Sequence, residues 1–205
     1  MFFYSKGGMK LKIEKMDALL KESLPPKRYE HSVNVMYEAV ILAHYYDVDE
    51  KKIRIASLLH DCGREIPKHE AAAKAKELGL KVTAIEEAQP ILLHAKLGKV
   101  IAEQKYQVDD EEILNAILLH TTGGKNMTTF DMVVFLADLI EPERKQKNVE
   151  KLRYLTKKNL ELAMLEALKS NMDFLMQQGR YIHPDCLECW NYLLFKRDEG
   201  PDNGR

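Results

Sequence analysis

The sequence predicts an all-α protein that forms a single globular domain of roughly eight to ten helices. Apolar residues recur at intervals of three and four along most of the chain, the spacing that places them on one face of a helix. No run alternates apolar and polar residues as a half-buried strand does, and no Asn-Gly turn joins two apolar runs. The 205 residues contain no internal repeat or low-complexity linker, so one core is expected.

Capping residues and prolines mark the helices of the first half. Asp49 caps a helix that continues to Leu59, and Pro67 occupies the first turn of a helix that ends near Gly79. Thr83-x-x-Glu86 is a capping box, and Pro90 begins the helix after it. We therefore expect helices over residues 11–23, 27–46, 49–59 and 67–79, a short one that opens at residue 83, and one over 90–106.

The second half carries similar boundary signals. Asp109 or Asp110 caps a helix that ends at His120, and the Thr122-Gly123-Gly124 run breaks it. Further helices are expected over residues 128–140, from Asn148 onward, and over 158–178 and 184–195. In the predicted domain, which spans residues 1–205, the core covers about residues 20–170, the C-terminal helices cover 158–195, and residues 198–205 form a frayed tail.

The composition excludes several classes of protein. The formal net charge is −1, with 31 basic and 32 acidic residues, so no global field recruits nucleic acid or an anionic membrane. Apolar stretches are too short to span a bilayer, and residues 1–12 do not resemble a signal peptide. We expect a cytoplasmic protein.

The three cysteines are expected to be packing residues. Cys186 and Cys189 lack the second pair that a zinc ribbon needs and are expected in helix packing, whereas Cys62 fills space behind the His60-Asp61 pair.

Six ligand-type residues lie in separate apolar segments, where burial of an imidazole or carboxylate is costly. A shared metal centre converts that cost into binding energy. Four imidazoles and two carboxylates exceed the needs of one tetrahedral ion and suit two ions, and this ligand set fits iron, manganese or zinc better than magnesium. Two such ions generate a nucleophile from water, so no serine or cysteine nucleophile is required. The six residues are His31, His60, Asp61, His94, His120 and Asp138.

The pattern His31…His60-Asp61…Asp138 resembles the H…HD…D signature of the HD-domain phosphohydrolase superfamily. The closer detail is similar to its YqeK-type branch, bacterial enzymes that split diadenosine tetraphosphate symmetrically into two ADP. The segments that carry this resemblance are residues 28–33, 58–65, 93–95, 120–123 and 137–144. The resemblance implies that His31, His60, Asp61 and Asp138 hold one ion, and that Asp61 bridges to a second ion held by His94 and His120.

Candidate substrate groups surround these ligands. Arg64, Lys68 and Arg144 are the best phosphate clamps, because a guanidinium group matches two phosphate oxygens at once. Thr121, Thr122 and the backbone of Gly123 are placed to cradle phosphate at a helix break. Glu65 is a candidate proton donor or ligand-orienting group. We therefore assign catalytic roles to Asp61, Arg64 and Glu65.

The sequence thus predicts a dinuclear-metal hydrolase that cleaves diadenosine tetraphosphate to two ADP by attack of a metal-bridging hydroxide. Its partner is a small nucleotide, with no nucleic acid or membrane, and Phe2-Phe3-Tyr4 is a candidate homodimer contact. The alternatives are another HD-type nucleotidase or phosphodiesterase, a non-catalytic nucleotide-binding module, and a purely structural helical bundle. His44, His69 and His183 are expected to be surface or capping residues.

Overall fold

Eleven α-helices and two 3₁₀ helices make up the regular structure of residues 11–198, the part that the computed structural model describes. This part contains no strand, so the all-α prediction is confirmed, with one α-helix more than expected. The candidate contact at residues 2–4 and most of the expected tail, residues 199–205, lie outside the described residues. The elements are α1 (Ile13–Ser23), α2 (Pro26–Tyr46), α3 (Glu50–Leu59), η1 (Cys62–Glu65), α4 (Ala71–Glu77), α5 (Ala84–Ala88), η2 (Pro90–Leu92), α6 (Leu93–Gln104), α7 (Glu111–Leu119), α8 (Thr129–Ile140), α9 (Val149–Thr156), α10 (Leu160–Gln177) and α11 (Pro184–Asp198).

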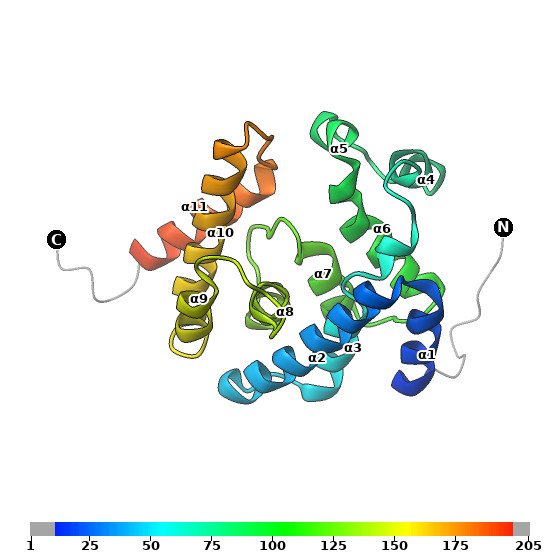
Figure 1. Ribbon diagram of the computed structural model, residues 1–205, viewed down its shortest axis with the longest axis horizontal. Coiled ribbons are helices and arrows are strands. Elements are labelled where there is room, and N and C mark those ends of the chain that lie inside the picture. Colours follow the sequence, from blue (N-terminus) through cyan, green and yellow to red (C-terminus); the bar gives the residue numbers. More distant parts are fainter. Residues whose placement is uncertain (1–10, 199–205) are drawn as a thin grey trace.

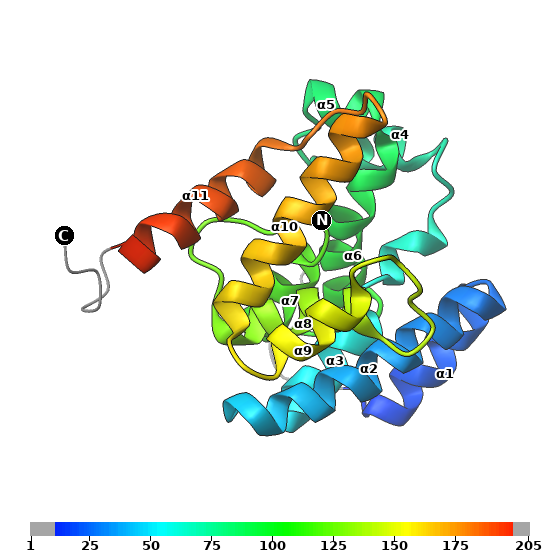
Figure 2. The same ribbon diagram turned by 60° about the vertical axis from the view of Figure 1, so that its left-hand side comes forward.

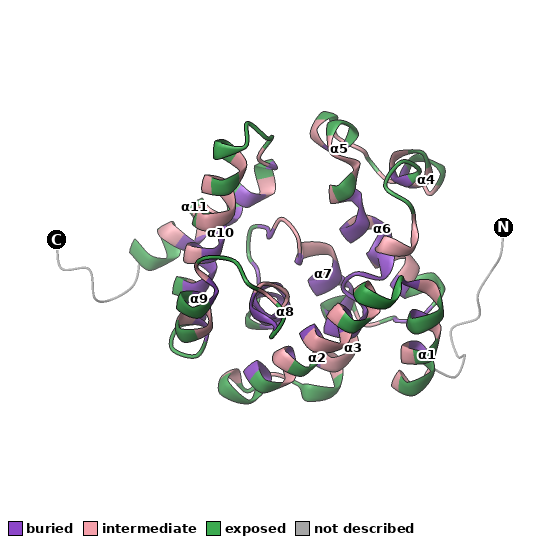
Figure 3. Cartoon of the chain, viewed as in Figure 1, coloured by how far each residue is buried: buried purple, intermediate pink, exposed green. Residues whose placement is uncertain are grey.

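Helix α8 lies at the centre of the domain, with neighbours on several sides (Figure 1). It packs against α2, α3, α7, α9 and α10. Nine of its twelve residues are buried. Purple, the colour of buried residues, is visible on this helix in Figure 3. Because α8 is apolar nearly all round, it behaves as a core helix rather than as an amphipathic surface helix.

The remaining helices cover this centre from two sides. Helices α4, α5 and α6 lie on one side in Figure 1, and α9, α10 and α11 lie on the other. Figure 2 shows α1 and α11 at opposite ends of the molecule. Among the helices of the described part, none has the length and apolar character needed to cross a membrane. Most of the predicted ligands lie on α6 and α8 or at the ends of α3 and α7.

Most predicted boundaries are confirmed, but the helix after Pro67 begins later than expected. Residues 62–65 form η1, Ile66 is extended, and α4 starts only at Ala71. A proline disfavours helical backbone in the residue before it, which fits the extended conformation of Ile66. The chain therefore leaves the His60-Asp61 segment through a tight 3₁₀ turn and a loop. The expected tail is also shorter, because α11 continues to Asp198.

Replacement of Asp49 by alanine is expected to lower the free energy of unfolding by about 1 kcal/mol, because it removes the N-cap of α3. The carboxylate of Asp49 accepts hydrogen bonds from the backbone N–H groups of Lys51, at 2.8 Å, and Lys52, at 3.1 Å. Thermal unfolding measures the change, and Lys51→Ala is the control because it keeps both backbone donors. Equal melting temperatures for the two variants would show that the cap contributes nothing.

Candidate metal centre

The end of α3 presents His60 and Asp61 to the same interior space. Helix α3 ends at Leu59 and His60 still has helical backbone angles, whereas Asp61, at φ −100° and ψ 11°, leaves the helix and begins η1. Two adjacent residues of a regular helix point in different directions, but this change of backbone lets both side chains converge. Both residues are buried.

All six predicted ligands lie together. His31, His60 and Asp138 form one group, and His60, Asp61 and His120 form a second, with the ligand atoms of each group within 4.8 Å of one another. His94 joins the second group, because its Nε2 lies 3.3 Å from Oδ1 of Asp61. Three of the imidazole rings stand edge to face in a row, with 5.0 Å between the centroids of His60 and His120 and 4.9 Å between those of His94 and His120.

Three of the histidines are oriented by the same local hydrogen bond. In His60, His94 and His120 the Nδ1–H donates to the backbone carbonyl three residues earlier, at 2.6, 2.5 and 2.7 Å. A carbonyl oxygen only accepts, so Nδ1 carries the proton and Nε2 keeps its lone pair. This arrangement is typical of metal-ligating histidines, in which a hydrogen bond fixes the tautomer and the ring orientation.

The Nε2 lone pairs of the site outnumber the hydrogen-bond donors around them, because the Thr121 hydroxyl, 3.0 Å from Nε2 of both His94 and His120, can donate to only one of the two. Nε2 of His94 lies 3.0 Å from Nε2 of His120, so two lone pairs face each other. Nε2 of His60 is buried and makes no hydrogen bond. Unpartnered buried polar atoms are costly, and a cation at this position satisfies them. The donor set therefore fits a transition-metal site.

The two carboxylate oxygens of Asp61 face different histidines. Oδ1 lies 3.3 Å from Nε2 of His94 and 3.7 Å from that of His120. Oδ2 lies 3.7 Å from Nε2 of His60 and 4.0 Å from that of His31. Asp61 therefore has one oxygen toward His94 and His120 and the other toward His60 and His31, and it would be able to bridge two ions held by these two pairs.

Glu141 is a functional residue that the sequence reasoning missed. Its Oε1 lies 3.2 Å from Nδ1 of His31, and His31 Nε2 lies 2.9 Å from Oδ1 of Asp138. Glu141 is buried and follows Asp138 by three residues at the end of α8. Its only sequence signal is that spacing, because the partner, His31, lies on α2.

Three arginines face the carboxylates of the site. Arg28, which was not predicted, places Nη1 2.7 Å from Oδ2 of Asp61, and Arg64 places Nε 3.0 Å from Oδ1 of the same residue. Arg144 forms an ion pair with Asp138 and donates from Nε to the carbonyl of Asp138 at 2.7 Å. The site therefore has guanidinium groups beside both carboxylates, where a phosphate substrate needs them.

Burial keeps His60 and His94 neutral. It lowers the pKa of His60 to about 4 and that of His94 to about 3, so both imidazoles are unprotonated at neutral pH and free to bind a metal. Burial alone raises the pKa of Asp61, but the surrounding imidazoles outweigh it and hold this pKa well below its usual range. For Asp138, burial likewise raises the pKa, but the hydrogen bond with His31 and the charges of Arg144 and the neighbouring imidazoles together outweigh it, so the pKa is lowered. Both carboxylates are ionised.

A cleft of about 750 Å³ opens above this centre. Its lining runs from the ligands His94, His120 and Asp138 to the α9 and α10 side of the domain. Arg64, Thr121 and Arg144 also line it, as predicted for substrate contacts. The hydroxyl oxygen of Thr121 lies 3.0 Å from Nε2 of both His94 and His120. The remaining lining residues include Phe135, Gln146, Lys147, Asn148, Lys151, Ser170, Asn171 and Phe174.

Other candidate substrate residues lie outside this cleft. The carboxylate of Glu65 pairs with Lys105 at 2.6 Å and lines neither this cleft nor the smaller cavity beside it. Gly123 has φ +67° and packs against α11, where a Cβ atom would lie 3.1 Å from Sγ of Cys189. Thr122 donates to the carbonyl of Gly123 and does not line the cleft either. Lys68 borders a smaller cavity on the far side of Arg64.

The three histidines that were expected to be surface or capping residues are placed much as expected. His44 and His69 are exposed. His183 is buried rather than on the surface, and its Nδ1 accepts the backbone N–H of Asp185 at the start of α11, so it acts as a cap. Cys62, Cys186 and Cys189 are free and buried, and burial raises the pKa of each thiol, as expected of packing residues.

Comparison with known proteins decides the family. Residues 28–143, which contain all six ligands, match the HD domain. This chain belongs to the HD domain family. Two relatives carry the name bis(5′-nucleosyl)-tetraphosphatase, symmetrical. The one from Halalkalibacterium halodurans is 35% identical over 87% of this chain and 95% of the relative, and the one from Bacillus subtilis is 34% identical over 86% of this chain and 95% of the relative.

A solved HD structure supports the same assignment. A predicted HD superfamily hydrolase involved in NAD metabolism, from Clostridium acetobutylicum, has a TM-score of 0.88 and is 34% identical, covering 92% of this chain and 100% of that chain. The sequence-based assignment to HD-type hydrolases is therefore confirmed. Members of this family bind divalent metal ions, and the described residues of this chain contain a His/Asp cluster with the donor atoms that such ions need.

Replacement of Glu141 by alanine in this HD site is expected to lower metal affinity or turnover by about 10- to 100-fold, the usual effect of removing a group that orients a metal ligand. His31 then loses the partner of Nδ1 while its own side chain remains. Metal titration of the stripped protein measures the affinity. Glu143→Ala is the matched control, because Glu143 is an exposed neighbour. Equal metal affinity in the two variants would show that Glu141 does not support metal binding through His31.

Proposed function

We propose that this chain is a symmetrical bis(5′-nucleosyl)-tetraphosphatase, which hydrolyses diadenosine tetraphosphate at its central phosphoanhydride bond to give two ADP. The observation that carries this proposal is the division of the Asp61 oxygens between two groups of histidines at one end of a cleft with basic lining residues. The substrate is taken from the names of the relatives, and the matches to these relatives cover most of the chain.

The six ligands would hold two metal ions, for which we propose iron first and manganese or zinc as alternatives. Imidazole nitrogens together with carboxylates suit these ions better than magnesium, which prefers oxygen ligands. When bound, two such ions activate water at neutral pH and neutralise charge on the phosphate oxygens. Which ion each histidine holds follows from the two faces of Asp61: His31 and His60 on one side, His94 and His120 on the other, with Asp138 beside His31.

The residues of the chain position the substrate around this bond. Hydrolysis joins a water oxygen to one central phosphorus atom and breaks the bond from that phosphorus to the bridging oxygen, which leaves with the second ADP. Arg64 and Arg144 contact the phosphate oxygens and stabilise the negative charge that develops on them. ADP is a good leaving group, so the reaction needs little help from a general acid, and the pairing of Glu65 with Lys105 fits a structural role for that carboxylate.

The decisive experiment combines metal analysis of the purified protein with a nucleotide panel. We expect bound transition metal and the conversion of diadenosine tetraphosphate to ADP alone, resolved by chromatography. Formation of ATP and AMP would point to an asymmetric hydrolase, and release of nucleoside would point to a nucleotidase. Tight nucleotide binding without turnover at full metal occupancy would indicate a non-catalytic module and overturn the proposal.

A cytoplasmic location stays a prediction. The three cysteines are free, which suits a reducing compartment.

A further inference from the structure

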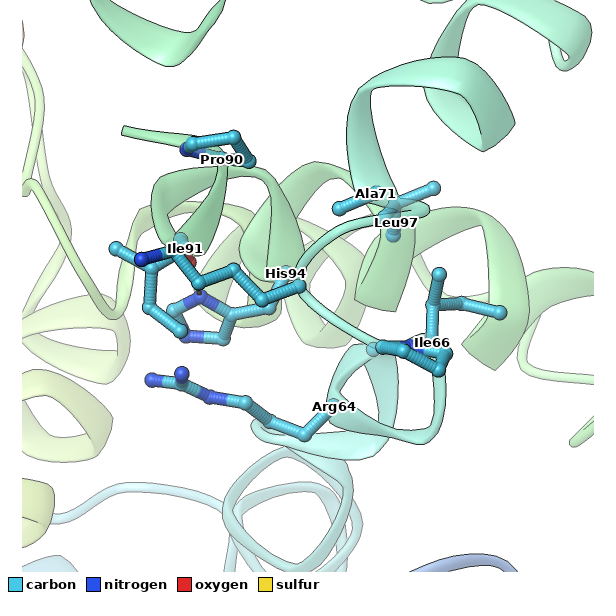
Figure 4. Close-up of a pocket in the computed structure, with 10 residues that line it drawn as sticks. Arg64, Ile66, Ala71, Pro90, Ile91, His94 and Leu97 are labelled. Carbon is cyan, nitrogen blue, oxygen red and sulfur yellow. Dashed lines mark hydrogen bonds between the residues drawn. The ribbon is translucent and has the colours of Figure 1, made fainter. Parts of the chain in front are cut away.

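Two cavities border the metal centre, and they share two lining residues. The cleft of about 750 Å³ and a second cavity of about 180 Å³ are both lined by Arg64 and His94. Figure 4 shows the small cavity, with the side chain of Arg64 extended beneath Ile91 and His94. Because Arg64 also holds Oδ1 of Asp61 through its Nε, the boundary between the cavities lies beside the candidate bridging carboxylate.

The small cavity has the character of a ligand site. Most of its lining side chains are apolar, and they come from the loop after η1, from α4, and from η2 and α6: Ile66, Ala71, Pro90, Ile91 and Leu97. Its polar groups gather at one side, where Arg64 and His94 face the metal centre, and Lys68 is exposed at the rim. Apolar walls with a few convergent polar groups are typical of sites for small molecules.

The chemistry of the substrate calls for two such sites. A dinucleoside tetraphosphate carries one nucleoside at each end of its polyphosphate chain. Cleavage at the middle bond requires the central phosphates at the metal ligands, so the two nucleosides must extend away from the centre in different directions. A chain with only one cavity would bind half of this substrate, whereas the structure has a cavity on each side of Arg64 and His94.

The volumes of the two cavities indicate which half of the dinucleotide each cavity holds. The larger one falls within the roughly 300–1,000 Å³ that is typical of a whole small-molecule ligand, and it suits a complete nucleotide. The smaller one falls below that range and suits a single planar base. From this geometry we infer that the small cavity holds the base of the second nucleotide of a dinucleoside polyphosphate, with Arg64 and Lys68 on its phosphates. This inference rests on the proposed function.

A substitution that fills the small cavity tests the assignment. Ala71→Leu adds bulk to its wall, and it is expected to lower kcat/KM for diadenosine tetraphosphate by about 10- to 100-fold, because binding of the remote nucleoside contributes to transition-state stabilisation. Adenosine 5′-tetraphosphate, which has one nucleoside, occupies the larger cleft, so its inhibition constant should not change. Ile91→Ala, which removes apolar surface at a partly exposed position, should weaken the dinucleotide selectively in the same way.

The controls separate this role from a structural one. Ala73→Leu makes the same change at an exposed position of α4 and should leave both constants unaltered. Metal content and melting temperature are measured for every variant. The assignment is overturned if Ala71→Leu and Ile91→Ala cleave the dinucleotide as well as the wild type, or if both ligands weaken equally. Failure of the wild-type, metal-loaded protein to cleave the dinucleotide would instead refute the proposed function, and the inference with it.

Discussion

Asp61→Ala is expected to reduce kcat for diadenosine tetraphosphate by roughly 10³-fold or more, about 4 kcal/mol in activation free energy, and to strip the protein of metal. The reason is geometric. Asp61 is the only one of the six ligands whose oxygens face both groups of histidines, at 3.3 and 3.7 Å on one side and 3.7 and 4.0 Å on the other. Its removal therefore damages both metal positions at once.

The loss also leaves positive charge without a partner. Arg28 and Arg64 both pair with the Asp61 carboxylate, and both lose that partner in the variant. Metal content by elemental analysis and turnover by product chromatography measure the two effects. Thermal unfolding shows whether the fold survives. An Asp61→Ala protein that keeps both its metal and its activity would refute the bridging role.

Asp131 provides the matched control, because it is a buried carboxylate of the same domain outside the site. It accepts hydrogen bonds from the backbone N–H and the hydroxyl group of Thr128 in the capping box of α8. Asp131→Ala should lower the free energy of unfolding by about 1–2 kcal/mol through loss of these bonds. Its metal content and its kcat should match those of the wild type. The comparison separates the loss of any buried carboxylate from the loss of this one.

The close grouping of the six candidate ligands was predictable from the sequence because residue type and an apolar setting together mark them. An imidazole or carboxylate in an apolar helical segment is costly to bury, and the six lie in separate segments of this kind. Capping residues such as Asp49 and Asp110 were also readable, since an N-cap acts on backbone groups two and three residues away. Features that depend only on neighbouring residues can therefore be predicted from the sequence.

Glu141, Arg28 and the small cavity depend instead on tertiary contacts. Glu141 acts on His31 only because α8 packs against α2. In the sequence, Arg28 is an ordinary basic residue near the start of α2. Only the folded chain places its Nη1 2.7 Å from Oδ2 of Asp61. Spacing along the chain carries little information about such pairs.

Gly63→Ala is expected to destabilise the protein by about 3 kcal/mol, at the upper end of the usual cost of overpacking a core. A Cβ atom at this position would lie 2.1 Å from the carbonyl oxygen of His94 and 2.7 Å from the backbone N of Gly98. Both are backbone atoms of α6, so no side-chain rotation relieves the clash. The His60-Asp61 turn and α6 must move apart.

That movement connects stability to the metal centre. Gly63 lies two residues after Asp61, and its clash is with His94 itself, so separation of the two segments lengthens the 3.3 Å approach of Asp61 to His94. We therefore expect a lower melting temperature by roughly 6–12 °C together with weaker metal binding. Differential scanning calorimetry and metal titration measure the two quantities on the same sample.

Gly98→Ala tests whether the effect is specific to the close approach. Gly98 is the other glycine at this contact, but the nearest atoms to its Cβ position are Cγ2 of Ile117, at 3.3 Å, and the backbone N of Gly63, at 3.5 Å. Alanine in a helix interior is favoured over glycine by about 1 kcal/mol, which offsets the tighter contact. Gly98→Ala should therefore stay near the wild type in stability and metal content. If Gly63→Ala behaves equally mildly, the spacing between the His60-Asp61 turn and α6 does not control the metal centre.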